Sequence, residues 1–176
     1  KSKQDGKNNY SVFHINLREK ITSRLTMEIE LKRAIENNEL EVWYQPIISS
    51  KTYRIHELEA LIRWKHHSKG VLFPDEFIPL AEESELISSL DRYVLINTMN
   101  SIKQLRTMIP DLKISINFSV KTLLQKDIEA TIENILHETG NPYSALSIEI
   151  TETGMTKNEK SLIEPMEYLT QKGVQF

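Results

Sequence analysis

The sequence predicts an α/β fold, the N-terminal portion of a (β/α)₈ barrel whose first strand is antiparallel. Segments with strand patterning alternate with amphipathic helical segments along most of the chain, which is typical of parallel βα units. Only a short turn separates the first two strands, so we expect an antiparallel pair, because parallel neighbours need a long crossover. The chain has 176 residues, whereas a closed barrel typically needs about 250. We therefore expect a fragment that contains only part of the barrel.

The expected elements follow one another along the chain. Residues 1–15 are polar and basic, with turn chemistry at Asp5-Gly6, and predict a tail or linker. From Asn16, apolar residues at helical spacing predict a helix that stops at Asn37. The predicted strands then cover 40–48, 55–64, 112–118 and 146–150, with a fifth opening at 174–176, and the predicted helices cover 73–82, 87–108, 126–139 and 158–172.

Composition and charge exclude several classes of function. The net charge of −3 gives no basic excess, so we expect no nucleic-acid polymer as a partner. The absence of cysteine excludes disulfides and cysteine-ligated zinc and fits a reducing, cytoplasmic compartment. No apolar run approaches the roughly 18 residues of a membrane span. We expect no membrane segment in this chain, and an anchor elsewhere in a longer parent protein stays compatible with that expectation.

Three predicted strands carry polar groups on one face and apolar groups on the other, because side chains alternate along a strand. A half-exposed sheet with its polar side in water explains this alternation equally well. The helical connections favour a covered sheet, in which the polar groups converge inside a barrel or at its carboxyl mouth. The polar set comprises Glu57, Glu59 and Arg63 on the second strand, Ser115 and Asn117 on the third, and Ser147 and Glu149 on the fourth.

Three members of this set predict a metal site. Glu59, Asn117 and Glu149 would supply only oxygen ligands. Hard oxygen donors suit Mg²⁺, Mn²⁺ or Ca²⁺ rather than zinc or copper. His66 and His67 fall on opposite faces if their strand continues, so we expect loop-exposed histidines and a poor joint metal site there.

Four segments resemble one known family. Glu59-Ala60-Leu61, within ELEALIRW and after WYQPI, resembles the signature of EAL domains, the cyclic di-GMP phosphodiesterases. The similarity continues through FPDEFIPLAEESELI, through ISINFS and through LSIEITET, and covers roughly residue 22 to the C-terminus. It implies a TIM-like (β/α)₈ barrel with an EAL domain over 16–176. Residues 1–15 separately resemble the C-terminal remnant of a GGDEF (diguanylate cyclase) domain, with a simple linker as the alternative.

The resemblance to EAL domains implies a two-metal phosphodiesterase that uses Mg²⁺ or Mn²⁺ and releases pGpG, with Ca²⁺ as an inhibitory ligand. It implies metal ligation by Glu59, Asn117 and Glu149. The implied catalytic residues are Glu59, Glu149 and Glu152. Glu152 resembles the family's glutamate that stabilises the loop carrying the ligands of the second metal ion. The implied substrate contacts are Gln45, Glu59, Leu61 and Arg63.

Two alternatives stay open. In the family, an aspartate pair, a lysine and a further glutamate lie on later strands, beyond Phe176. We therefore expect this fragment to be inactive and its parent protein to hydrolyse cyclic di-GMP. The resemblance also implies a homodimer as a partner arrangement, because EAL domains commonly form dimers. The alternative function is an inactive EAL module that serves as a cyclic di-GMP receptor or interaction domain. For Arg63, the alternative to substrate binding is a structural ion pair with Glu57 or Glu59.

Overall fold

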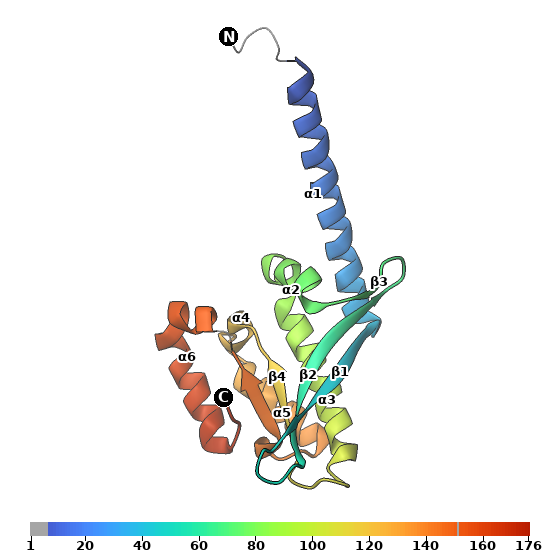
Figure 1. Ribbon diagram of the computed structural model, residues 1–176. Coiled ribbons are helices and arrows are strands. Elements are labelled where there is room, and N and C mark those ends of the chain that lie inside the picture. Colours follow the sequence, from blue (N-terminus) through green and yellow to red (C-terminus); the bar gives the residue numbers. More distant parts are fainter. Residues whose placement is uncertain (1–6, 151) are drawn as a thin grey trace.

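The computed structural model describes the backbone of residues 7–150 and 152–176 and the side chains of residues 18–150 and 160–176. A long helix leads into a mixed sheet that is covered by helices on one side (Figure 1). The helices and strands, in chain order, are α1 (Lys7–Glu36), β1 (Leu40–Ile48), β2 (Ile55–His66), β3 (Gly70–Leu72), α2 (Pro74–Glu83), α3 (Ile87–Leu105), β4 (Lys113–Asn117), α4 (Val120–Leu123), α5 (Ile128–Thr139), a 3₁₀ turn (Tyr143–Ala145), β5 (Leu146–Glu149) and α6 (Glu152–Lys172).

The sheet has the order β1-β2-β4-β5, and β3 pairs with β2. The β1–β2 pair is antiparallel, while β2–β4 and β4–β5 are parallel. The prediction of an α/β fold with an antiparallel first strand and part of a barrel is therefore confirmed. Next to β5, the backbone N–H of Gln175 donates to Leu146 O at 3.1 Å, and the backbone N–H of Ile148 donates to Gln175 O at 2.8 Å. These bonds make a parallel bridge at the place of the predicted fifth strand.

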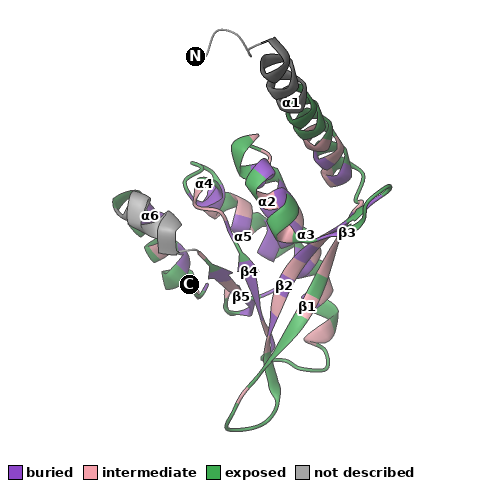
Figure 2. Ribbon diagram, turned by 45° about the horizontal axis from the view of Figure 1, so that its top comes forward, coloured by how far each residue is buried: buried purple, intermediate pink, exposed green. Residues whose placement is uncertain are grey.

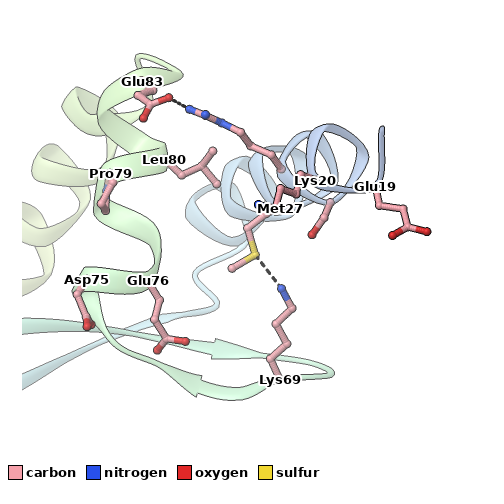
Figure 3. A pocket seen from close by; sticks show the side chains of 11 residues that line it. Glu19, Lys20, Met27, Lys69, Asp75, Glu76, Pro79, Leu80 and Glu83 are labelled. Atoms are coloured by element: carbon pink, nitrogen blue, oxygen red, sulfur yellow. Dashed lines mark hydrogen bonds and ion pairs between the residues drawn. The ribbon is translucent and has the colours of Figure 1, made fainter. Parts of the chain in front are cut away.

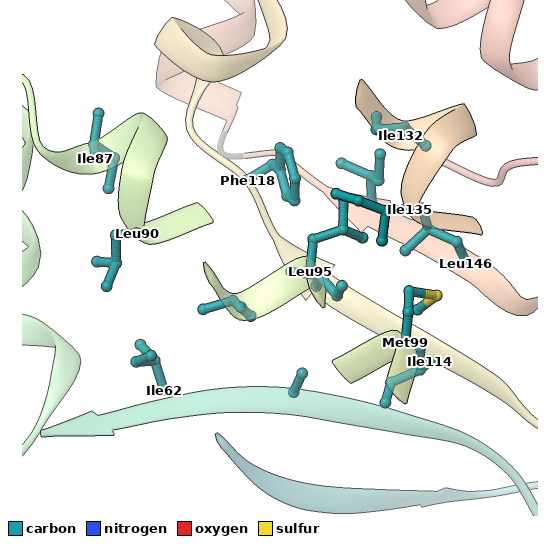
Figure 4. Close-up of a cluster of buried hydrophobic side chains, with 14 of the residues drawn as sticks. Ile62, Ile87, Leu90, Leu95, Met99, Ile114, Phe118, Ile132, Ile135 and Leu146 are labelled. Atoms are coloured by element: carbon teal, nitrogen blue, oxygen red, sulfur yellow. The ribbon is translucent and has the colours of Figure 1, made fainter. Parts of the chain in front are cut away.

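The core lies between one face of the sheet and the helices α3 and α5. Along β2 the even-numbered residues from Leu58 to Trp64 are buried and the odd-numbered residues between them are only partly buried. Figure 4 shows Ile62 and Ile114 pointing from the strands toward α3, with Ile114 beside Met99. The alternation therefore places Leu58, Ala60, Ile62 and Trp64 against the helices and leaves Glu59, Leu61 and Arg63 on the opposite face.

Among the side chains of α1 that the structure describes, residues 18–36, those at the C-terminal end join this core. Leu31 and Ala34 are fully buried, whereas Ile21, Leu25 and Ile29 are exposed. Figure 2 shows the same change along the helix, from exposed to buried toward the sheet. None of the helices in the described part of the chain has the length and apolar composition needed to cross a bilayer.

Three features differ from the sequence predictions. Helix α1 begins at Lys7 rather than at Asn16, and α6 begins at Glu152 rather than near residue 158. The short elements β3 and α4 were not predicted. β3 folds back on β2 through a turn that ends at Gly70, whose φ of 79° is accessible to glycine at little cost. α4 begins after Ser119, whose Oγ accepts a hydrogen bond from Lys121 N at 3.2 Å.

Candidate active site at the carboxyl ends of the parallel strands

The three predicted metal ligands lie on the polar face of neighbouring strands. Asn117 and Glu149 are register partners at the ends of β4 and β5, and Glu59 of β2 is the partner of Ser115. Asn117 Nδ2 donates to Glu59 Oε1 at 3.3 Å. The parallel register therefore brings two carboxylates and an amide from three separate strands to one edge of the sheet, where catalytic groups of (β/α)₈ barrels are found.

The charges at this edge fit a divalent cation. No lysine or arginine forms an ion pair with Glu59 or Glu149 within the described part of the chain. The amide of Asn117 can turn its oxygen inward, since its oxygen and nitrogen occupy equivalent positions. Two uncompensated carboxylates and an amide oxygen form the donor set that Mg²⁺ and Mn²⁺ prefer.

Gln45 and Leu61 flank Glu59 on the same sheet. Gln45 on β1 is the register partner of Glu59, and Trp43 is the partner of Leu61. Directly opposed residues of an antiparallel pair share a face, so Gln45 lies beside Glu59 on the polar side. Gln45 is exposed and Leu61 is half-buried. Both side chains are accessible to a ligand that binds over the strand ends.

Arg63 lies between two aromatic rings on the same face of β2. Its Cζ is 5.4 Å from the centroid of the Trp43 ring and 4.9 Å from that of Phe73. Its Nη1 donates to Ile62 O at 2.8 Å, and its Nε is buried without a partner. Among the described residues no carboxylate pairs with Arg63; Glu57 lies 3.9 Å from His56 instead. The alternative of a structural ion pair is therefore wrong.

Glu152 is the first residue of α6, but its side chain lies outside the described residues. Its predicted catalytic role stays a prediction. The backbone places it three residues after Glu149, at the loop that follows β5.

Asp91 is a supporting residue that the sequence analysis missed. This carboxylate is 4% exposed on α3, and it accepts hydrogen bonds from Ser119 N at 2.9 Å and Thr122 Oγ1 at 2.5 Å. It therefore holds the segment that follows Asn117 against α3. Burial raises the pKa of Asp91 to about 6, against the lowering effect of these two hydrogen bonds. The available signal was an acidic residue within the apolar spacing of a predicted helix.

A surface hollow lies elsewhere, between α1 and α2 (Figure 3). Its walls include Met27 of α1 and Leu80 of α2, and Arg24 pairs with Glu83 across it. None of the predicted site residues lines it. A search for the functional site that used this hollow alone would therefore have missed the strand ends.

The prediction of loop-exposed histidines is wrong for His66 and right for His67, which is exposed in the turn after β2. His66 is buried rather than loop-exposed, and the chain turns directly after it. The two imidazole rings stack with centroids 4.6 Å apart instead of facing opposite ways. The structure also brings Glu30 of α1 to both rings.

Fold and site together define part of an α/β barrel with a candidate oxygen-ligand metal site at the carboxyl ends of its strands. The sequence model of the EAL domain family matches residues 28–176. The chain therefore belongs to the EAL domain family.

The curated relatives include named cyclic di-GMP phosphodiesterases. The chain is 33% identical over 174 residues to the cyclic di-GMP phosphodiesterase NbdA of Pseudomonas aeruginosa, covering 98% of this chain and 22% of NbdA. It is 28% identical over 174 residues to the cyclic di-GMP phosphodiesterase PdeR of Escherichia coli, covering 99% of this chain and 26% of PdeR. The chain thus spans about a quarter of the length of these relatives.

Solved structures agree with the fold. A PaMucR phosphodiesterase in complex with c-di-GMP aligns with a TM-score of 0.80 and 27% identity, over 85% of this chain and 61% of that chain. The Xanthomonas citri FimX EAL domain in complex with c-diGMP aligns with a TM-score of 0.79 over 89% of this chain and 61% of that one. The second match, at 16% identity, shows the fold alone.

Proposed function

We propose that this chain is the N-terminal part of a metal-dependent phosphodiesterase domain that hydrolyses cyclic di-GMP to linear pGpG. The convergence of Glu59, Asn117 and Glu149 at the strand ends carries the proposal. Membership of the EAL family and two relatives named as cyclic di-GMP phosphodiesterases support the substrate.

Glu59, Asn117 and Glu149 would hold a Mg²⁺ or Mn²⁺ ion. When bound, such an ion polarises phosphate oxygens and lowers the pKa of water, which supplies a nucleophile at neutral pH. The two glutamates would place negative charge where the cation binds, and the Asn117 amide, which lies beside Glu59, would turn its oxygen to the same ion. Ca²⁺ fits the same oxygen donors and would compete as an inhibitor.

Arg63 is suited to a phosphate of the substrate. Its guanidinium is held by Trp43 and Phe73 and has no carboxylate partner among the described residues, so its charge is available to a ligand. Guanidinium donors match phosphate oxygens in a bidentate geometry. Gln45 would add a neutral hydrogen bond beside Glu59, and Leu61 would contact an apolar part of the dinucleotide.

We further propose that this chain alone is inactive. Its described sheet has five strands, including the short β3, whereas the family barrel has eight, so ligands for a second ion are expected on strands that complete the barrel. Glu152 would steady the loop near that second ion. We also propose that residues 1–15 are the end of a GGDEF domain or a linker. The proposed assembly is a homodimer.

The test measures conversion of cyclic di-GMP to pGpG with Mg²⁺ or Mn²⁺, using a protein that carries the complete EAL domain and the 176-residue chain. Glu59→Gln should lower kcat by about 100-fold or more, because it removes a charged ligand of the metal. Glu57→Gln is the matched control, since it removes a carboxylate from the same face of β2 and should leave kcat within about twofold. Equal losses in both variants would contradict the role of Glu59. If the protein with the complete domain binds the dinucleotide without hydrolysing it, the proposed function is a receptor rather than an enzyme.

A further inference from the structure

A second group of metal-ligating side chains lies on the opposite face of β2. Glu30 comes from α1, His66 is the last residue of β2, and His67 begins the turn to β3. His66 Nε2 is 3.1 Å from Glu30 Oε2, and His67 Nε2 is 3.8 Å from Glu30 Oε1. One ligand atom of each residue lies within 4.8 Å of those of the other two.

Packing fixes one imidazole and leaves the other adjustable. The His66 side chain is 1% exposed and its ring centroid lies 4.9 Å from that of Trp64. The His67 side chain is 58% exposed and stacks on His66 with an interplanar angle of 22°. The buried ring can define the site, while the exposed ring has room to tilt and complete it.

The hydrogen bonds of His66 are compatible with ligation through Nε2. Ser68 N donates to His66 Nδ1 at 3.2 Å, so in this arrangement the ring proton is on Nε2 and is donated to Glu30. Ligation would move that proton to Nδ1, which would then donate to Ser68 Oγ at 3.3 Å and would give up the hydrogen bond from Ser68 N. A partner of this kind on the second nitrogen is the usual support of a ligating histidine.

The charge of Glu30 is free for a cation. Among the described residues it pairs with His66 and His67 and with no lysine or arginine. Lys69 lies nearby, but its amine is directed to Met27 Sδ at 3.5 Å (Figure 3). A surface hollow lined by Thr26, Glu30, His66, Ser68 and Lys69, among others, gives solvent and ions access to the cluster.

The separations also fit a single ion. Ligands bound at 2.0–2.1 Å in a tetrahedral site lie about 3.3 Å from one another. The distances from Glu30 to His66 and His67, 3.1 and 3.8 Å, bracket this value. The two distances involve different oxygens of Glu30, and the three ligand atoms lie within 4.8 Å of one another, so closing the site needs a rotation of the exposed His67 ring out of its stack on His66.

We propose that Glu30, His66 and His67 bind a borderline divalent ion of the Zn²⁺ class, with water as the fourth ligand. Two imidazole nitrogens and one carboxylate select such an ion over Mg²⁺. Bound there, it links α1 to the β2–β3 turn. The site differs from the strand-end site in ligand chemistry and in the face of β2 that it uses.

The proposal is tested by measuring Zn²⁺ binding to the full chain with titration calorimetry. Excess Mg²⁺ is present so that the oxygen-ligand site is filled. One Zn²⁺ should bind, and His67→Ala should weaken it by at least about 10-fold. His137→Ala, which removes an exposed histidine of α5, is the matched control and should bind as wild type does. Because His67 is exposed, its loss should leave the fold intact, which the melting temperature without metal verifies.

Electron paramagnetic resonance with Cu²⁺ in place of Zn²⁺ identifies the ligands. Two nitrogen couplings should appear in wild type and one in His67→Ala. Glu30→Gln should weaken binding without removing a nitrogen coupling. Oxygen-only coordination, or equal Zn²⁺ affinity in wild type and His67→Ala, would overturn the proposal. Neither result depends on phosphodiesterase activity.

Discussion

Asp91 is a single buried carboxylate that connects the core to the candidate metal site. It receives hydrogen bonds from Ser119 and Thr122, in the segment directly after Asn117. Its pKa is raised to about 6 because burial disfavours the ionised form, and Glu82 adds a repulsive charge. A raised pKa means that the folded state binds the proton more tightly than the unfolded state does.

Replacing Asp91 with asparagine should remove a pH dependence of stability. The contribution from the proton of Asp91 is fully present below about pH 4 and is lost as the pH rises through about 6. As the pH rises from about 4 to above 6, the unfolding free energy of wild type should fall by up to about 3 kcal/mol relative to that of Asp91→Asn. Urea denaturation of both proteins at several pH values measures the difference. A difference that stays constant with pH would show that the pKa of Asp91 is unshifted.

Replacing Arg63 with lysine should weaken binding of cyclic di-GMP by about tenfold. Lysine keeps the charge but lacks the planar donors and the stacking surface that Trp43 and Phe73 hold in place. Lys65→Met is the control, since Lys65 pairs with Glu41 and should not contact substrate. Calorimetric titration of the protein with a complete domain gives both affinities. Equal affinities in the two variants would exclude Arg63 from the binding site.

The sequence predicted the residues whose position follows from strand parity alone. Glu59, Asn117 and Glu149 share the polar face as expected. Asp91 was missed because its partners lie about thirty residues away and on another element. His66 was misplaced because β2 continues to His66, two residues beyond the predicted end of the strand, and so keeps this side chain on the buried face.

At the scale of elements, α1 depends on a short contact with the core. Leu31→Ala should cost about 2–5 kcal/mol of unfolding free energy, because it leaves a cavity at a fully buried site. Ile29→Ala on the same helix should change stability by less than about 0.5 kcal/mol, because Ile29 is 70% exposed. Urea denaturation at pH 7 compares the two. Equal effects would mean that α1 packs through a different face.

Four strands were predicted closely, whereas β3, α4 and the starts of α1 and α6 were not. β1 has the predicted bounds, and the other three predicted strands are within two residues of theirs at each end. β3 has three residues and α4 four, too few for a period of two or 3.6 to be visible. β3 forms because it pairs with β2, and a pairing partner cannot be identified from local pattern.

At the scale of the whole molecule, the sheet has an open edge at β1. In the described sheet β1 pairs only with β2, and its residues Trp43, Ile47 and Ile48 are exposed. Unpaired strand edges with apolar side chains favour association with another copy. We therefore expect the 176-residue chain to self-associate.

Sedimentation velocity over a range of concentrations tests this expectation. Ile48→Lys should shift the chain toward monomer, because a charge on an edge strand opposes pairing. Met108→Lys, which places the same charge on an exposed residue after α3, should leave association unchanged. A wild-type chain that stays monomeric at all concentrations would contradict the prediction.

The alternation of β2 also separates two kinds of evolutionary constraint. Selection for folding acts on Leu58, Ala60, Ile62 and Trp64, whose side chains fill the core. Glu59 and Arg63 alternate with them in the chain yet contribute little to that packing. Mutational libraries at these odd positions should therefore remain mostly folded while their chemistry changes. A screen that scores only expression or solubility would fail to detect the residues of the proposed active site.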